Sequence, residues 1–268
     1  MSDGDYVLGT QDEEIERLGL QHRVWRARML DGWARAGIGP GQSVLDIGAG
    51  PGFATSDLAE IVGASGKVLA FERSSRFLRA LQARAARLGL HNVEAREHDV
   101  AQAPLGDDIA DAAWCRWVLS FVADPAATVR HIAQALRPGG LAIFHEYADY
   151  GAWQMMPPHP DVDRFRALVM QSWRDNGGEP DVALHLPRLL NEAGMEVVEA
   201  RPLIQIVRRG DFAWAWPAAF MAVNAARLQD LGYATAEEAG RFARALDDCP
   251  EQALMITPLV AQIIARRV

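Results

Sequence analysis

Short apolar runs alternate with helical patterns along the first half of the chain. The runs predict strands at 43–45, 67–71, 93–97, 109–115 and 141–146. Between them, apolar residues spaced three and four apart predict helices at 54–62, 75–88 and 125–136. This repeated alternation of strand and helix is typical of a parallel, doubly wound α/β sheet.

A long helix is predicted before the first strand, over residues 10–35. Thr10 and Glu13 have capping-box spacing at its start. Its apolar stripe, at intervals of three and four, consists of Ile15, Leu18, His22, Trp25 and Met29. This segment is expected to form a helical cap.

The second half is less regular. It predicts helices at about 161–174 and 187–193, a strand at 195–200 that 203–207 prolongs, and helices at about 212–229 and 235–247. The last strand is expected at 258–266, although its apolar spacing would also fit a helix. The fold class is therefore α/β: a mostly parallel, seven-stranded, Rossmann-like sheet with a helical lid before the last strand. We expect a cap at 1–40, a core at 41–150, and substrate-side helices with the remaining strands at 151–268.

Composition narrows the class of protein. Half of the 268 residues are apolar, yet charged residues, glycine or proline interrupt every run that approaches a membrane span. The acidic start argues against a targeting peptide, so the expected location is the cytoplasm. The net charge of −8 argues against a nucleic-acid partner. The two cysteines provide no disulfide framework, and no metal-ligand spacing occurs. The sequence leaves open whether the protein forms a homodimer.

A glycine-rich turn follows the first core strand and is the most specific motif. It reads Leu45-Asp-Ile-Gly-Ala-Gly-Pro-Gly-Phe53. Such a turn brings backbone against a nucleotide-like ligand, because side chains would block the approach. The spacing is G-x-G-x-G. It differs from the dinucleotide spacing G-x-G-x-x-G because position 53 is Phe.

Three carboxylates follow successive strands of the predicted sheet. Asp46, Glu72 and Asp99 all lie at carboxyl ends, where open parallel sheets bind ligands. An acidic edge suits a cofactor that carries an ammonium group, a ribose diol and an adenine amine better than it suits a phosphate. A carboxylate beside a diol accepts two charge-assisted hydrogen bonds.

The glycine motif, these carboxylates and the later turn Leu136-Arg-Pro-Gly-Gly140 together resemble class I S-adenosylmethionine (SAM) dependent methyltransferases of the small-molecule type. The resemblance covers residues 43–146 and implies SAM as cofactor. It implies that the glycine loop holds the methionine part, Glu72 the ribose hydroxyls and Asp99 the adenine amine. N-terminal helices of this superfamily often act as a lid, which adds Tyr6 and Gln21. The full set of expected cofactor-binding residues is Tyr6, Gln21, Asp46, Gly48, Ala49, Gly50, Gly52, Glu72, Arg73, Asp99, Val100, Cys115 and Arg116.

Candidate bases are fewer than in many methyltransferases. The loop after the fourth strand reads Arg116-Trp-Val-Leu-Ser120, so the base that the family often has there cannot be carried over. Glu146 and His145 end the fifth strand, where an acceptor should approach, and His22 is a third candidate. Strand alternation puts His145 and Glu146 on opposite faces, so at most one faces the ligand. Simple packing is the competing interpretation for both histidines.

The second half also carries the aromatic residues expected to contact substrate. They are Tyr147, Trp153, Trp173, Trp214 and Trp216, each of which would equally suit a hydrophobic core. The predicted function is methyl transfer from SAM to an O, N or C atom of a small, partly apolar or aromatic metabolite. The alternatives are an NAD(P)-dependent oxidoreductase, a SAM-binding protein without transferase activity, and a SAM protein that assists a rearrangement.

Overall fold

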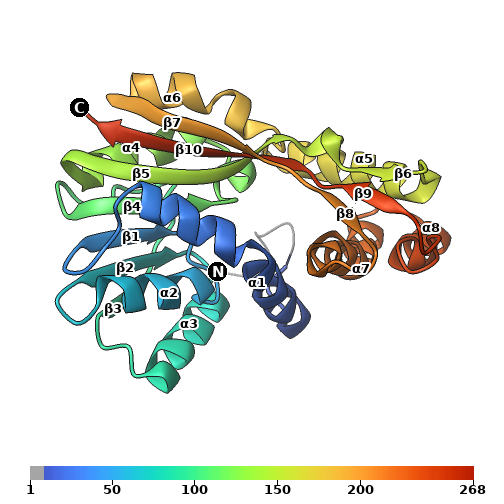
Figure 1. Ribbon diagram of the computed structural model, residues 1–268, viewed down its shortest axis with the longest axis horizontal. Helices are drawn as coiled ribbons and strands as arrows, with labels where there is room; N and C mark the ends of the chain where they lie inside the picture. Colours follow the sequence, from blue (N-terminus) through green and yellow to red (C-terminus); the bar gives the residue numbers. More distant parts are fainter. Residues whose placement is uncertain (1–8) are drawn as a thin grey trace.

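The computed structural model describes residues 9–268 and contains a seven-stranded sheet (Figure 1). The strand order is β3-β2-β1-β4-β5-β10-β7. Strands β1 to β5 are parallel, and β10 runs antiparallel to both β5 and β7. The strands are β1 Ser43–Ile47, β2 Lys67–Glu72, β3 Val93–Glu97, β4 Ala110–Arg116, β5 Leu136–Asp149, β7 Met195–Leu203 and β10 Leu259–Arg267. The predicted α/β class and seven-stranded sheet are confirmed.

Helices cover both faces of this sheet. On one face, Trp33 and Leu58 pack against Trp114, and on the other Ile132 and Leu189 pack near Ile47. The first face carries α1 Asp12–Arg35, α2 Phe53–Val62 and α3 Ser75–Leu88, and the second carries α4 Pro125–Ala135 and α6 Leu186–Glu192. The two-sided cover explains why the central strands are apolar on both faces.

The lid lies between β7 and β10, as the sequence predicts. Its helices α7 Ala215–Asp230 and α8 Ala236–Arg244 pack with α5 Pro160–Asp175. Figure 1 places α1 between the main sheet and α7. Side chains of these helices form one aromatic cluster, which includes Trp25 of α1 and Trp216 of α7.

A second, three-stranded sheet was not predicted. Its order is β6-β9-β8, formed by Gln154–Met156, Leu254–Ile256 and Ile206–Arg208. Each strand has three residues, too few to show an alternating pattern. The prediction that residues 203–207 prolong the preceding strand is therefore wrong in part, because the chain leaves β7 after Leu203 and pairs again in the small sheet.

Two further predictions concern the start of α1 and the type of the last element. Helix α1 begins after Gln11 without a side-chain cap, so the Thr10–Glu13 capping box is wrong. Thr10 is instead buried. The last segment is strand β10, not a helix, because it pairs along its length with β5 and β7. Among residues 9–268, none of the helices is both long and apolar enough to cross a bilayer.

Candidate functional site

A cavity lies at the carboxyl ends of β1, β2 and β4, where the sheet order reverses. Leu18 and Gln21 of α1 and Phe220 of α7 cover it. It encloses about 1260 Å³ free of protein atoms, a figure that includes its opening to solvent.

The glycine loop forms the floor of one end. Gly48 and Gly50 have φ of 63° and 55°, in the left-handed region that side chains rarely adopt. A Cβ on Gly48 would lie 2.4 Å from the Val118 side chain, whereas one on Gly50 would meet no atom within 4 Å. Gly48 is thus required for packing between two loops, and Gly50 exposes its backbone to the open cavity. Ala49 lines the cavity with them.

Gly52 lies outside the cavity lining. It precedes the first residue of α2, and a Cβ there would press on Leu81. Of the predicted glycines, Gly52 is thus the one that the structure does not bring to the cavity. Gly52 shapes the start of the helix instead.

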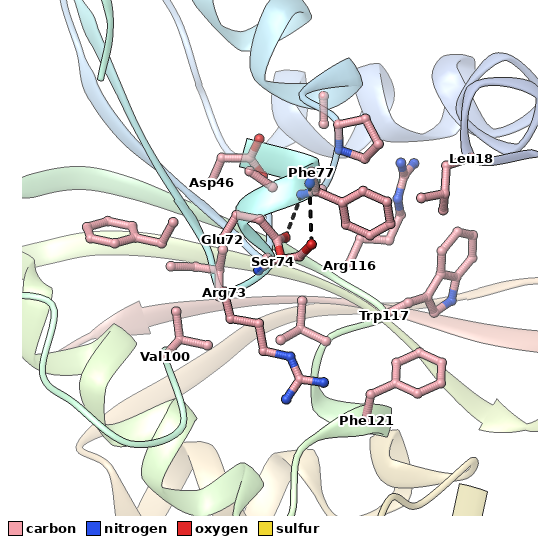
Figure 2. Close-up of a pocket in the computed structure, with 18 of the residues that line it drawn as sticks. Leu18, Asp46, Glu72, Arg73, Ser74, Phe77, Val100, Arg116, Trp117 and Phe121 are labelled. Atoms are coloured by element: carbon pink, nitrogen blue, oxygen red, sulfur yellow. Dashed lines mark hydrogen bonds between the residues drawn. The ribbon is translucent and has the colours of Figure 1, made fainter. Parts of the chain in front are cut away.

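Glu72 joins the glycine loop to the end of β2. Its Oε2 accepts the N–H of Gly50 at 2.9 Å and its Oε1 accepts the N–H of Ser74 at 2.7 Å. Burial raises the pKa of this carboxyl, and the backbone N–H groups oppose that rise. Figure 2 shows Glu72 and Asp46 on one side of the cavity, with Trp117 and Phe121 on the other.

Asp46 and Asp99 are the other two carboxylates of the cavity lining. Asp46 accepts the hydroxyl of Thr55 at 2.6 Å, and burial raises its pKa to about 7. Asp99 accepts the N–H of Ala101 at 3.0 Å. Val100 and Arg73 complete this end, so the predicted acidic edge comes together as one surface.

Arg116 lies at the end of β4 and lines the cavity. Its guanidinium stands over the rings of Trp114 and Trp117, at 5.7 and 5.1 Å from their centroids. Burial lowers its pKa to about 10, so the group remains a cation at neutral pH.

The neighbouring Cys115 faces away from the cavity. It is buried among core residues with Sγ 3.9 Å from a carboxylate oxygen of Glu146. Alternation along β4 sends Cys115 and Arg116 to opposite faces, so of these two expected cofactor residues only Arg116 lines the cavity.

None of the three predicted bases lines the cavity. Glu146 is fully buried, and its carboxylate accepts the N–H groups of Val118 and Leu119 at 2.9 and 3.0 Å and the hydroxyl of Ser120 at 3.2 Å. Burial raises its pKa to about 7. These bonds hold the loop after β4, which is a structural role.

The two histidines are packed instead of facing ligand. His145 is fully buried, and its Nε2 lies 2.9 Å from Oε1 of Gln262. Burial lowers the pKa of His145 to about 3, so the ring is neutral. His22 stacks on Phe53 and pairs with Asp57 at 3.1 Å. The packing interpretation was correct for both.

Aromatic side chains line the other end of the cavity. Tyr147 and Trp173 do so as predicted, but Trp153, Trp214 and Trp216 are buried behind them in the aromatic cluster. Trp117 lies between Tyr147 and Trp216, stacked on both with centroid distances of 5.5 and 5.7 Å. Its φ of 51° is rare for a bulky residue and marks a constrained loop beside the cavity.

Several lining residues were not predicted. They include Arg17, Phe53, Phe71, Ser74, Phe77, His98, Trp114, Trp117, Val118, Phe121 and Phe220. Helical spacing could have identified Arg17, which lies one turn from Gln21. Trp117 and Phe121 belong to a loop at a strand end, where ligand contacts are common. Gln21 lines the cavity as expected, whereas Tyr6 lies outside the described residues.

The comparisons with known proteins agree with this geometry. The profile of the family "Methyltransferase domain" matches residues 45–144. The chain is 31% identical over 186 residues to an uncharacterized 37.1 kDa protein in transposon TN4556 of Streptomyces fradiae, covering 69% of this chain and 52% of that one. It is 31% identical over 153 residues to 2-phytyl-1,4-naphtoquinone methyltransferase of Synechococcus elongatus, covering 57% of this chain and 61% of that one. The chain thus spans between half and two thirds of each relative.

Solved structures share the fold. The crystal structure of BH2331 from Bacillus halodurans C-125, assigned as a methyltransferase, superposes with a TM-score of 0.61 at 18% identity, covering 90% of this chain and 99% of that one. Residues 45–144 thus match a methyltransferase domain, and the fold of the chain is that of class I SAM-dependent methyltransferases. The cofactor of this class is SAM.

The described residues fit this cofactor. Gly50 leaves its backbone open to the cavity, and Glu72 lies beside it as a carboxylate acceptor. Asp99 and Val100 offer a polar and an apolar contact at the far end of the same lining. SAM contains an amino acid, a ribose and an adenine, which require acceptors and apolar surface in this order along one edge.

Proposed function

We propose that this protein transfers the methyl group of SAM to an O, N or C atom of a small, partly apolar or aromatic acceptor. One observation carries the proposal: the glycine loop and Glu72 share a single cavity with an aromatic wall. The first end suits an adenosine-linked amino acid, and the second suits a flat apolar molecule.

The residues of the cofactor end have distinct roles in this proposal. Glu72 accepts hydrogen bonds from the ribose hydroxyls while its bond to Gly50 keeps the loop in place. Asp99 accepts the adenine amine, and Val100 packs on the ring. Asp46 stabilises the cationic amino acid, and Gln21 covers it from α1.

Orientation does most of the catalytic work. SAM supplies an activated methyl group on a sulfonium. Trp117, Tyr147 and Trp173 hold a planar acceptor in one direction against that end, and the lid excludes water. Correct orientation of two reactants can lower a barrier by about 7–11 kcal/mol.

Among the described lining residues, no carboxylate or imidazole lies at the acceptor end. Those of the cavity are at the cofactor end: Asp46 lies in β1, Glu72 ends β2, and His98 and Asp99 follow β3. We therefore expect an acceptor that is nucleophilic at neutral pH without losing a proton to the protein. The named relative, a phytyl-naphthoquinone methyltransferase, supports an aromatic acceptor with apolar substituents.

Two measurements test the proposal. Calorimetry should detect binding of SAM and of S-adenosylhomocysteine, and no binding of NADH. Incubation with SAM and a panel of aromatic hydroxy and amino compounds should give a product heavier by one CH₂ in mass spectrometry. Clear NADH binding without binding of either adenosyl compound would reject the proposal in favour of an oxidoreductase.

A further inference from the structure

Arg116 is a cation with no strong acceptor among residues 9–268. A guanidinium has five N–H donors. Here Nη1 donates to the thioether sulfur of Met29 at 3.8 Å. Sulfur is a weak acceptor. Asp46 and Asp57 act on Arg116 through space, without direct contact.

The two indole rings explain how such a cation is held. Trp114 and Trp117 offer their faces to the guanidinium, which an aromatic face attracts. Contact with ring faces supplies no strong hydrogen-bond acceptor, so it does not satisfy the N–H donors of the guanidinium. Trp117 is itself fixed by stacking on Tyr147 and Trp216, which holds one of the two rings beside Arg116 in place.

A buried or half-buried cation without hydrogen-bond acceptors is costly. The cost falls when a bound molecule brings an oxyanion, because charge-assisted bonds to a carboxylate or phenolate are the strongest that arginine makes. Since Arg116 lines the cavity, such a molecule can reach it. A sulfonium cofactor in the same cavity strengthens the demand for negative charge.

We infer that Arg116 is the oxyanion-binding residue of this cavity and that its N–H edge pairs with an acidic group of a bound small molecule. The inference rests on the proposed function. The oxyanion has two available sources, the carboxylate of the cofactor and an acidic group on the acceptor. In the second case, Arg116 stabilises the ionised acceptor and makes a general base unnecessary.

The experiment compares wild type with Arg116→Gln and Arg116→Lys. The first arm measures affinity for S-adenosylhomocysteine and for 5′-methylthioadenosine, which lacks the amino-acid carboxylate. The second arm, at saturating S-adenosylhomocysteine, measures affinity for naphthalene-2-carboxylate and naphthalene-2-carboxamide. Arg23→Gln, an exposed position on α1, is the matched control.

We expect Arg116→Gln to lower the affinity for one carboxylate-bearing ligand by about tenfold to a hundredfold. Its uncharged counterpart should bind as before. Loss confined to S-adenosylhomocysteine assigns the oxyanion to the cofactor, and loss confined to naphthalene-2-carboxylate assigns it to the acceptor. Arg116→Lys should bind that ligand more tightly than Arg116→Gln does but less tightly than wild type, because lysine keeps the positive charge and cannot form two parallel hydrogen bonds to a carboxylate.

Equal affinities of wild type and Arg116→Gln for both carboxylates overturn the inference. Parallel weakening of charged and uncharged ligands also overturns it, since a merely structural role would affect both. The proposed function fails separately, when wild type binds no S-adenosylhomocysteine. Thermal unfolding of each variant verifies that it is folded.

Discussion

The Oε1 atom of Glu146 accepts the backbone N–H of Leu119 at 3.0 Å. The same carboxylate bonds the N–H of Val118 and the hydroxyl of Ser120. Glu146 lies on β5 and these three residues belong to the loop after β4. A buried carboxylate therefore fixes the loop that brings Val118 and Phe121 to the cavity.

Glu146→Gln should lower the free energy of unfolding by about 1–3 kcal/mol, because an amide N–H₂ then faces buried donors. Chemical denaturation measures this loss. Glu192→Gln, whose carboxylate is exposed on α6, should change stability by about 0–1 kcal/mol. Unchanged stability together with abolished methyl transfer would return Glu146 to the role of a base.

The cofactor end was predictable because its residues form consecutive strand-end motifs. Gly48, Gly50, Glu72 and Asp99 each follow a strand, and parallel strands bring such positions together. The acceptor end was less predictable. Alternation along β5 separates the faces of His145 and Glu146, but sequence does not reveal that a loop and a lid bury both.

Distance along the chain explains the remaining errors. Phe220 reaches the cavity only because α7 packs on α1, a contact between segments about two hundred residues apart. Trp173 and Trp214 are both predicted to contact substrate, yet only the first lines the cavity. Tertiary packing decides which aromatic residue of a lid meets ligand.

Glu72→Gln should lower the affinity for S-adenosylhomocysteine by about tenfold to a hundredfold, because the ribose hydroxyls would then bond to a neutral acceptor in place of a charged one. Calorimetry measures the effect. Glu97→Gln is the control, since Glu97 is exposed at the end of the adjacent strand β3. Equal affinities for wild type and Glu72→Gln would remove Glu72 from the ribose site.

Asp46 predicts a pH dependence of cofactor binding. Its pKa is raised from 3.8 to about 7. As pH rises through that value the carboxylate ionises, so affinity for the cationic amino acid should increase between pH 6 and 8. Calorimetry at several pH values measures this, and Asp46→Asn should flatten the profile.

The same raised pKa of Asp46 makes rising pH lower the stability of the ligand-free protein. A carboxyl whose folded pKa is raised stabilises the fold below its unfolded pKa and loses that contribution as pH rises through its folded pKa. Asp46 should therefore cost the free protein stability between about pH 4 and 7, and Asp46→Asn should reduce that loss. An identical pH profile of unfolding in both proteins would contradict the assignment.

Gln21 links the cap to the lid. Its Oε1 accepts Arg17 Nη1 and Trp216 Nε1, each at 2.9 Å. Gln21→Ala leaves the buried indole N–H without this acceptor, which should cost about 1–3 kcal/mol and loosen α7 over the cavity. Stopped-flow fluorescence should then record faster release of S-adenosylhomocysteine. Gln229→Ala, exposed on α7, should leave the release rate unchanged.

Gly50→Ala separates binding from stability. Both Gly50 and Gly89 have positive φ, 55° and 67°, and a Cβ on either would meet no atom within 4 Å. Each alanine variant should therefore lose a similar amount of stability, about 1–2 kcal/mol from the left-handed backbone. Only Gly50 borders the cavity. Gly50→Ala should reduce affinity for S-adenosylhomocysteine at least tenfold, because its methyl group occupies space that the ligand needs, while Gly89→Ala binds as wild type. Equal affinities in calorimetry would mean that the ligand does not approach this backbone.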